Sequence, residues 1–399
     1  MSRRERIRAV VFFGHSRTHW RRILADTLVG ALRLTPERIP ARLRTHRHVR
    51  FLFDREYRIL SAYPDWKEAF AASPLLDIQW CNVNNLFEYR AGLRALKQAP
   101  LGIILHSAAW DDLAILRRAV PAFQARRARL LVCFGNEYNE MPAKIGFARA
   151  TGAEYIATQL PLGAAQWLYA ECPAARVLPA PAALNADLYR PSTRPRTIDI
   201  GFRGDVYANL YSLGDLERSA VIRYVGERAE RWGLRTDIAY ERYPREEWCA
   251  FLQACRGVVG AESGTYFLER DDRTQRAVIQ YVRQHPDARF EEVYERFFKG
   301  YPDPVSGKAI SSRHFEPIGT QTCQVLLEGH YNGILKADEH YISIRKDFSN
   351  ADDAIRRFKD DAYREAMVRR THEYVMAEHT YRHRVEALLR AITADGLPA

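Results

Sequence analysis

Short apolar runs alternate with amphipathic segments through the first half of the chain. Runs of β-favouring apolar residues occupy positions 9–13, 57–62, 76–83, 101–106, 130–134 and 154–158. Between them, apolar residues recur at helical spacing over positions 20–34, 66–72, 87–97, 113–126 and 162–170. This alternation predicts a parallel sheet with helices on both faces. Residues 42–54, which include His46 and His48, are basic and irregular, and we expect a connecting loop there.

The second half repeats the same α/β alternation. We expect strands at 198–202, 235–240, 257–261, 323–327 and 341–344, and helices at 217–232, 245–255, 274–285, 289–298, 351–358, 363–378 and 379–389. A proline-containing stretch lies between the two halves. Because proline disfavours both helix and sheet interiors, we interpret this stretch as a linker. We therefore predict an N-terminal domain at 1–190, a linker at 191–197, a C-terminal domain at 198–378 with a helical insertion at about 267–309, and a closing helical segment at 379–399.

The composition agrees with two domains that each have a hydrophobic core. The chain has 399 residues, of which 47% are hydrophobic, enough for two domains of ordinary size. It contains neither an apolar run of about 20 residues nor a charged-then-apolar leader, so we expect a cytoplasmic protein without a membrane span. The six cysteines are scattered without paired metal-ligand spacing, which favours reduced buried thiols over a zinc site.

The net charge of +11 is the one unusual compositional feature. Arginine occurs along the whole chain, with small clusters at residues 3–8, 42–50 and 126–129. No aromatic-interleaved nucleic-acid motif accompanies these clusters. The charge therefore favours an anionic, phosphate-bearing substrate or a contact with the inner face of a membrane over a nucleic acid.

Polar residues follow several predicted strands of the first domain, where ligands gather in parallel α/β sheets. They include His15, next to Gly14, and His106. The loops also carry carboxylates, of which Asp111 and Glu137 are our first candidates for a general base. The structural alternative is an ordinary turn at Gly14 and a strand-end histidine bonded to the backbone at His106.

The stretch 310–327, ISSRHFEPIGTQTCQVLL, predicts a short helix followed by a buried strand. Glu316 lies within the helical part, and Ser312, Arg313 and Thr320 surround it with hydrogen-bond donors. A carboxylate can accept bonds from the two hydroxyls of a ribose, while an arginine and helix-terminal N–H groups bind phosphate. A solvated helix start is the alternative for this stretch alone.

Arg313, Phe315, Glu316 and Gly319, together with the HTYRHRVEALL tail at 379–389, resemble the GT-B glycosyltransferases of the group related to spore-maturation proteins. The resemblance covers about residues 176–390 and extends to the first half by pattern. It implies two Rossmann-like, doubly wound parallel-sheet domains that face a central cleft, with the final helix crossing back to the first domain. The run IILHSAAWDD is similar to the segment in retaining enzymes whose histidine, here His106, faces the transferred sugar.

The resemblance also implies the donor site. Arg203 and Gly204 would lie under the diphosphate, Ser263 would face the same crevice, and Gly319 belongs to the donor motif. The sequence departs from the family at two positions. First, the lysine that many relatives have a few residues after Gly204 is absent. Second, retaining enzymes of this fold commonly have two glutamates spaced E-x7-E, and Lys308 stands eight residues before Glu316, where the first glutamate would be. Lys308 or Arg313 would then supply the missing positive charge, and the stereochemical outcome stays open.

These observations predict a glycosyltransferase that moves a sugar from a nucleotide-diphosphate-sugar to a glycan, lipid-linked or small-molecule acceptor. We expect no cofactor and no metal, because no D-x-D type cluster lies at a strand end. The alternatives are a non-catalytic nucleotide- or sugar-binding relative, a nucleotide-sugar epimerase, and a nucleic-acid-binding protein. Donor base, sugar, acceptor and the role of the insertion are not fixed by the sequence.

Overall fold

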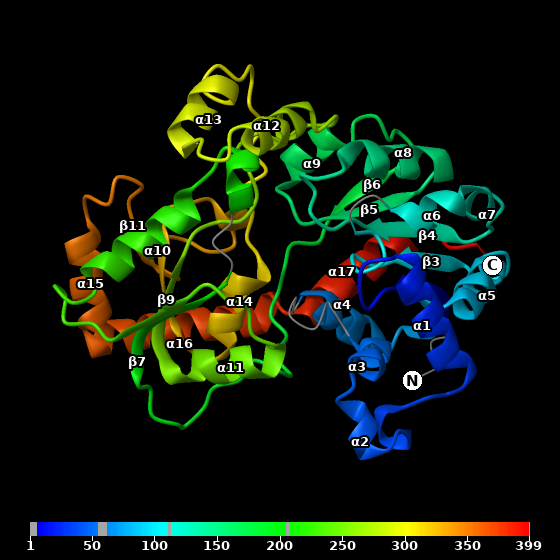
Figure 1. Cartoon of the computed structure of the whole chain (residues 1–399), viewed down its shortest axis with the longest axis horizontal. Coiled ribbons are helices and arrows are strands. Elements are labelled where there is room, and N and C mark those ends of the chain that lie inside the picture. The colour runs from blue at the N-terminus through cyan, green and yellow to red at the C-terminus, as the bar shows by residue number, and fades with distance from the viewer. Residues whose placement is uncertain (1–5, 55–61, 111–112, 205–207, 399) are drawn as a thin grey trace. The chain divides into compact units, whose positions relative to one another are not determined.

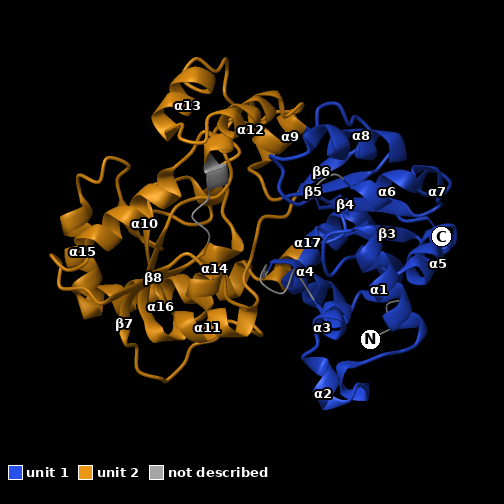
Figure 2. Cartoon of the chain, in the orientation of Figure 1, with its two compact units in different colours: residues 1–158, 169–178, 385–399 blue, residues 159–168, 179–384 orange. Residues whose placement is uncertain are grey.

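The computed structural model describes residues 6–54, 62–110, 113–204 and 208–398. These residues form two compact units (Figure 2). Unit 1 comprises residues 1–158, 169–178 and 385–399, and unit 2 comprises residues 159–168 and 179–384. The chain thus enters unit 2 before the end of unit 1 and returns to unit 1 with its last residues.

Unit 1 is built on a six-stranded sheet with the order β2-β1-β3-β4-β5-β6 (Figure 1). Its strands are β1 (Ile7–Phe13), β2 (Leu76–Asn82), β3 (Leu101–Ile104), β4 (Arg129–Cys133), β5 (Tyr155–Thr158) and β6 (Arg176–Pro179). The pairs from β2 through β5 are parallel. β3 is buried at every position, and β1 is buried at its last five, as expected for strands covered on both faces.

Helices separate the strands of unit 1, as the apolar spacing predicts. They are α1 (Trp20–Ala31), α2 (Ala41–Arg44), α3 (Arg47–Phe53), α4 (Ala62–Ala71), α5 (Leu86–Ala95), α6 (Ala114–Arg118), α7 (Val120–Gln124) and α8 (Met141–Thr151). Two predictions are wrong here: residues 42–54 form α2 and α3 instead of an irregular loop, and Ala62 begins a helix instead of ending a strand. The remainder of the strand predicted at 57–62 lies outside the described residues.

Unit 2 is built on a five-stranded parallel sheet with the order β11-β10-β9-β7-β8. Its strands are β7 (Ile198–Arg203), β8 (Thr236–Ala239), β9 (Cys255–Gly260), β10 (Cys323–Leu327) and β11 (Ile342–Ile344). β10 coincides with the predicted strand 323–327. The two sheets confirm the predicted pair of doubly wound α/β folds.

The helices of unit 2 follow the predicted order. They are α9 (Leu162–Leu168), α10 (Glu217–Arg228), α11 (Arg245–Ala254), α12 (Arg273–Gln284), α13 (Phe290–Phe297), α14 (Ser312–Gly319), α15 (Ala351–Lys359), α16 (Asp361–Glu378) and the start of α17 (Tyr381–Ala394), whose remainder belongs to unit 1. The predicted insertion is a helical pair, α12 and α13, with a small core of its own around Val278, Val293 and Phe298. Helices α11 and α14 lie near the strand ends at which the sequence predicts the donor site.

All six cysteines are free and buried, as predicted for reduced thiols. No helix among the described residues has the length and the apolar composition needed to span a membrane.

Candidate functional site

A pocket opens in unit 2 at the carboxyl ends of β7 and β9. It encloses about 570 Å³ of empty space, including its open mouth. The floor is formed by sheet residues, and the walls come from α10, α11, α14 and the loops after β8 and β9. The lining residues are Gly201, Phe202, Gly204, Arg218, Arg242, Trp248, Val258, Val259, Gly260, Ala261, Ser263, Ser311, Arg313, His314, Pro317, Gln324 and Leu326.

The lining of the pocket is rich in arginine. Among the described residues that line it, three are arginines and none is a carboxylate. Arg313 lies on α14, with its guanidinium 4.6 Å from the centre of the Trp248 ring and Nη1 donating to the carbonyl of Arg203. Gly204 lies beside it, since a Cβ at this position would be 3.7 Å from Arg313 Nη2. An anion of several charges is therefore the ligand class that this pocket suits.

The start of α14 is fixed by a capping box. Ser311 is the N-cap, and the imidazole of His314 closes the first turn. His314 Nδ1 accepts from the backbone N–H of Ser311 at 3.0 Å, and Nε2 lies 3.1 Å from the carbonyl oxygen of Ala261. Because a carbonyl only accepts, Nε2 carries the proton and the ring is neutral. The imidazole thus joins the α14 N-terminus to the loop after β9, on the pocket wall.

We expect the α14 cap to weaken in acid. Burial lowers the pKa of His314 to about 4, and the positive charges of Arg218 and Lys308 act in the same direction. The unfolded chain takes up a proton near pH 6.5 while the folded ring does not, so stability is complete above about 6.5 and is lost as pH falls toward 4. The slope is at most about 1.4 kcal/mol per pH unit. Hydrogen exchange of the 312–319 peptide should therefore accelerate between pH 7 and 5, after correction for the intrinsic exchange rate.

The matched variant for this prediction is His314→Gln, which removes the titrating ring. Its corrected exchange should be faster than that of the native protein at pH 7 but should change less on acidification. Equal pH slopes in the two proteins would show that His314 does not control the stability of this helix.

The side chain of Glu316 is buried and bonds to a residue of the pocket wall. Its Oε2 accepts from Trp248 Nε1 at 2.6 Å, and the residue is 3% exposed. Trp248 lines the pocket, as do Arg313 and Pro317 on either side of Glu316 along α14. The carboxylate therefore orients the indole on which Arg313 stacks, a role that the sequence did not indicate. Direct binding of a ribose by Glu316 stays a prediction.

Gln324 supplies a polar group to the pocket interior. The residue lies on β10, is 3% exposed and lines the pocket. Neither its Oε1 nor its Nε2 has a hydrogen-bond partner among the described residues. A buried amide without partners costs free energy, and a ligand hydroxyl or heterocycle could satisfy it. Sequence reasoning missed Gln324, although one polar residue within a buried apolar strand is a readable signal.

Arg203 does not point its charge at the pocket. Its guanidinium forms a bidentate ion pair with Asp237, with both distances 2.8 Å, and it lies 4.2 Å from the centre of the Phe251 ring. This differs from the predicted phosphate contact, because the side chain is occupied in cross-linking β7 to β8. Arg218 and Arg242, which the sequence analysis did not select, contribute pocket charge in its place.

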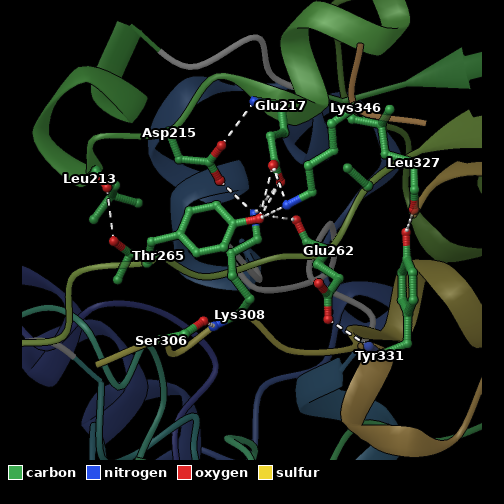
Figure 3. A network of polar contacts seen from close by, with 12 residues as sticks. Leu213, Asp215, Glu217, Glu262, Thr265, Ser306, Lys308, Leu327, Tyr331 and Lys346 are labelled. Atoms are coloured by element: carbon green, nitrogen blue, oxygen red, sulfur yellow. Dashed lines mark hydrogen bonds and ion pairs between the residues drawn. The ribbon is translucent and has the colours of Figure 1, made fainter. Parts of the chain in front are cut away.

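Lys308 differs from its predicted role as well, because it is the centre of a buried charge network (Figure 3). Its Nζ lies 2.5 Å from Asp215 Oδ2 and 3.4 Å from Glu217 Oε2, and its side chain is 3% exposed. Glu217 also pairs with Lys346 at 2.8 Å. Burial alone would raise the pKa of Glu217, but the hydrogen bond from Lys346 and the charge of Lys308 outweigh it and lower this pKa. Lys308 is thus neutralised within the protein.

The remaining predicted donor residues divide into two groups. Ser263 lines the pocket, and its loop is held by paired backbone bonds with Ala309, both 2.9 Å. Ser312 is the first residue of α14 and follows the lining residue Ser311. Gly319 and Thr320 are buried at the far end of α14, where a Cβ on Gly319 would be 2.7 Å from the carbonyl oxygen of Tyr189 and Thr320 Oγ1 lies 2.9 Å from Thr322 Oγ1. The last two positions are packing sites, which differs from the prediction.

In unit 1, His106 lies inside the molecule at the end of β3. It is 1% exposed and stacks on Trp66 with 5.3 Å between ring centres. Burial lowers the pKa of His106 to about 3, so the ring is neutral. Neither ring nitrogen has a hydrogen-bond partner among the described residues. His15 is half-buried, and its ring lies nearly perpendicular to that of Phe13, with 5.0 Å between ring centres.

The two predicted general bases have different outcomes. Glu137 is buried, and its Oε1 accepts from Thr158 Oγ1 at 2.8 Å and from Tyr169 OH at 2.9 Å. These bonds fix the carboxylate within unit 1 and leave it less available as a base than the sequence suggested. Asp111 lies outside the described residues. Among the described residues, no group of three or more His, Cys, Asp or Glu side chains is arranged to hold a metal ion.

Residues 301–390 match the family model described as Glycosyl transferase-like. The matched segment contains α14, β10 and β11, and it covers less than a quarter of the chain. It confirms the resemblance to glycosyltransferases in the region that carries the pocket helix. The narrower resemblance to the spore-maturation group stays a prediction. No curated protein matches the sequence.

Solved glycosyltransferase structures align along nearly the whole chain. Sucrose-phosphate synthase from Thermosynechococcus elongatus is 12% identical, covers 98% of this chain and 100% of its own, and has a TM-score of 0.48. HepE from Anabaena in complex with UDP-glucose is 7% identical, with 97% and 100% coverage and a TM-score of 0.49. Trehalose 6-phosphate synthase from Burkholderia multivorans is 13% identical, with 98% and 97% coverage and a TM-score of 0.38.

Proposed function

We propose that the protein is a glycosyltransferase whose donor is a nucleoside-diphosphate sugar. The observation that carries the proposal is the pocket of unit 2: three arginines and no carboxylate line it in the described chain, and one wall is a helix of the matched glycosyltransferase segment. A diphosphate group offers oxygens that can accept bidentate hydrogen bonds from such arginines.

The groups around the pocket can be assigned to parts of the donor. Arg313 and the first turn of α14 offer a guanidinium and the positive end of the helix dipole to the diphosphate. Gln324 offers an unpartnered amide to the base or the pentose. Trp248 offers an aromatic ring that Glu316 holds in place. Catalysis would then depend on positive charge already placed to stabilise the departing diphosphate, and it would need no metal.

Unit 1 is proposed to bind the acceptor, which is a glycan, a lipid-linked sugar or a small molecule. His106 supports this assignment, because its two ring nitrogens are buried without partners at a strand end and its ring is neutral at physiological pH. A neutral imidazole can hydrogen-bond to a sugar hydroxyl, whereas the lowered pKa makes His106 a weak proton acceptor.

The direct test is thermal stability in the presence of nucleoside diphosphates. We expect at least one of UDP, GDP, ADP and TDP to raise the melting temperature, since a ligand at a hundred times its Kd stabilises the native state by about 2.7 kcal/mol. The corresponding monophosphates should have a smaller effect because they bring less charge to the arginines. Absence of a shift with every diphosphate would contradict the donor assignment.

A non-catalytic relative is the second candidate, and Lys308 favours it. The family places a glutamate where this chain has a lysine bound to Asp215. Incubation of the protein with the sugar nucleotide of the preferred base separates the two functions. Release of free nucleoside diphosphate in the presence of acceptor indicates transfer, a changed sugar without acceptor indicates epimerisation, and neither result indicates binding alone.

A further inference from the structure

Helix α1 carries an apolar stripe on its solvent side. Trp20, Leu24, Leu28 and Leu32 follow one another at intervals of four residues and are 69%, 53%, 45% and 61% exposed. Residues four apart lie on the same face of a helix, so these side chains form one continuous row. A surface helix normally turns such a row toward the core.

The opposite face of α1 is fixed by polar bonds. Arg22 and Asp26 are buried and form an ion pair of 3.5 Å. Arg22 Nη1 donates to the carbonyl oxygen of Phe51 on α3, and Asp26 Oδ2 accepts from Asn82 Nδ2 at 2.9 Å. The helix is therefore held with its charged pair inward and its leucines outward. Rotating it to bury the leucines would break these bonds.

The chain around the stripe is strongly basic. Residues 17–53 contain nine arginines against two carboxylates, a net charge of +7 out of +11 for the whole chain, and one of those carboxylates is the buried Asp26. The segment contains α2 and α3, and α3 packs against α1 (Figure 1). Arg21, Arg42 and Arg50 are exposed, as is Leu43 on α2.

We propose that the exposed apolar row of α1, together with the exposed arginines of α1, α2 and α3, docks on an anionic membrane surface; these side chains are called the docking face of unit 1. An interfacial helix inserts tryptophan and leucine among the acyl chains while arginines bind lipid phosphates. The basic charge disfavours a second copy of the same face as the occupant, because like charges would meet. A nucleic acid would satisfy the arginines but would leave the leucine row in water. The membrane accounts for both features.

The test is sedimentation of the full-length protein with lipid vesicles. Vesicles of phosphatidylcholine with one third phosphatidylglycerol should bind the protein, and pure phosphatidylcholine should bind it roughly tenfold or more weakly. Leu24→Ser combined with Leu28→Ser should reduce binding about tenfold or more through lost insertion. Arg42→Gln combined with Arg50→Gln should reduce it to a similar extent and should lower its salt dependence.

The matched control is Leu162→Ser on α9, which removes a leucine that is 40% exposed outside this face and should leave vesicle binding unchanged. All substituted positions are exposed, and the stabilisation by nucleoside diphosphates should be the same in every variant. Equal binding to neutral and anionic vesicles would overturn the proposal. Absence of vesicle binding would overturn it as well, and a dimer that Leu24→Ser and Leu28→Ser disperse would then assign the face to a second copy.

Discussion

Replacing Lys308 with methionine is expected to destabilise unit 2 by about 3–5 kcal/mol. The substitution removes the ammonium group that lies 2.5 Å from Asp215 and 3.4 Å from Glu217, and it leaves the carboxylate of Asp215 buried without that counterion. An uncompensated buried charge costs far more than the pair contributes. Hydrogen exchange of peptides from β9 and β10 would measure the loss within unit 2.

Two further variants separate charge from packing. Lys346→Met removes the other lysine that pairs with Glu217. Because the side chain of Lys346 is 46% exposed, this substitution should cost about 1 kcal/mol or less. Adding Asp215→Asn to Lys308→Met removes the unpaired charge and should recover at least half of the loss. If the double variant were as unstable as Lys308→Met, volume at this position would be the cause instead of charge.

Replacing Arg313 with alanine should weaken nucleoside-diphosphate binding about ten- to a hundredfold, which corresponds to about 1.5–3 kcal/mol for a hydrogen bond to a charged group. The guanidinium lines the pocket, stacks on Trp248 and donates to the backbone beside Gly204. Arg313→Lys keeps the positive charge but loses the planar guanidinium that can form two parallel hydrogen bonds. Its affinity should therefore lie between those of the native protein and Arg313→Ala. Titration calorimetry with the diphosphate found in the stability screen would measure both variants.

The matched control for Arg313 is Arg283→Ala on the exposed face of α12, which changes the net charge equally without touching the pocket. It should bind like the native protein. An Arg313→Ala protein with native melting temperature and unchanged affinity would show that the diphosphate does not bind at α14.

The fold was largely predictable because buried parallel strands leave a strong local signal. β10 matches its predicted bounds, and α14 follows directly from the polar start and apolar spacing of residues 311–319. The short helices α2 and α3 were missed because their arginine-rich sequence has no buried face: none of their residues is buried. Apolar periodicity cannot indicate a helix that buries nothing.

The pocket was only partly predictable, because several of its residues interact with partners that are far away in the sequence. Arg313 was identified from a local motif, and Gly204 from the family resemblance. The neutralisation of Lys308 depends on Asp215, 93 residues earlier, and the orientation of Glu316 depends on Trp248, 68 residues earlier. Such partners are brought together only by sheet order. Arg242 enters the pocket from a loop whose sequence carries no motif.

The buried network around Lys308 also bears on the speed of ligand capture. The ammonium group of Lys308, on the segment that precedes α14, bonds to Asp215 in the loop before α10 and to the carbonyl of Glu262 in the loop after β9. The backbone N–H of Lys308 also donates to Ser306 Oγ. These segments are therefore already in place when the ligand arrives, and they have little conformational freedom left to lose. Their contribution to association should be that of a rigid wall, so the encounter rate would rise in proportion to ligand concentration without a plateau from loop ordering.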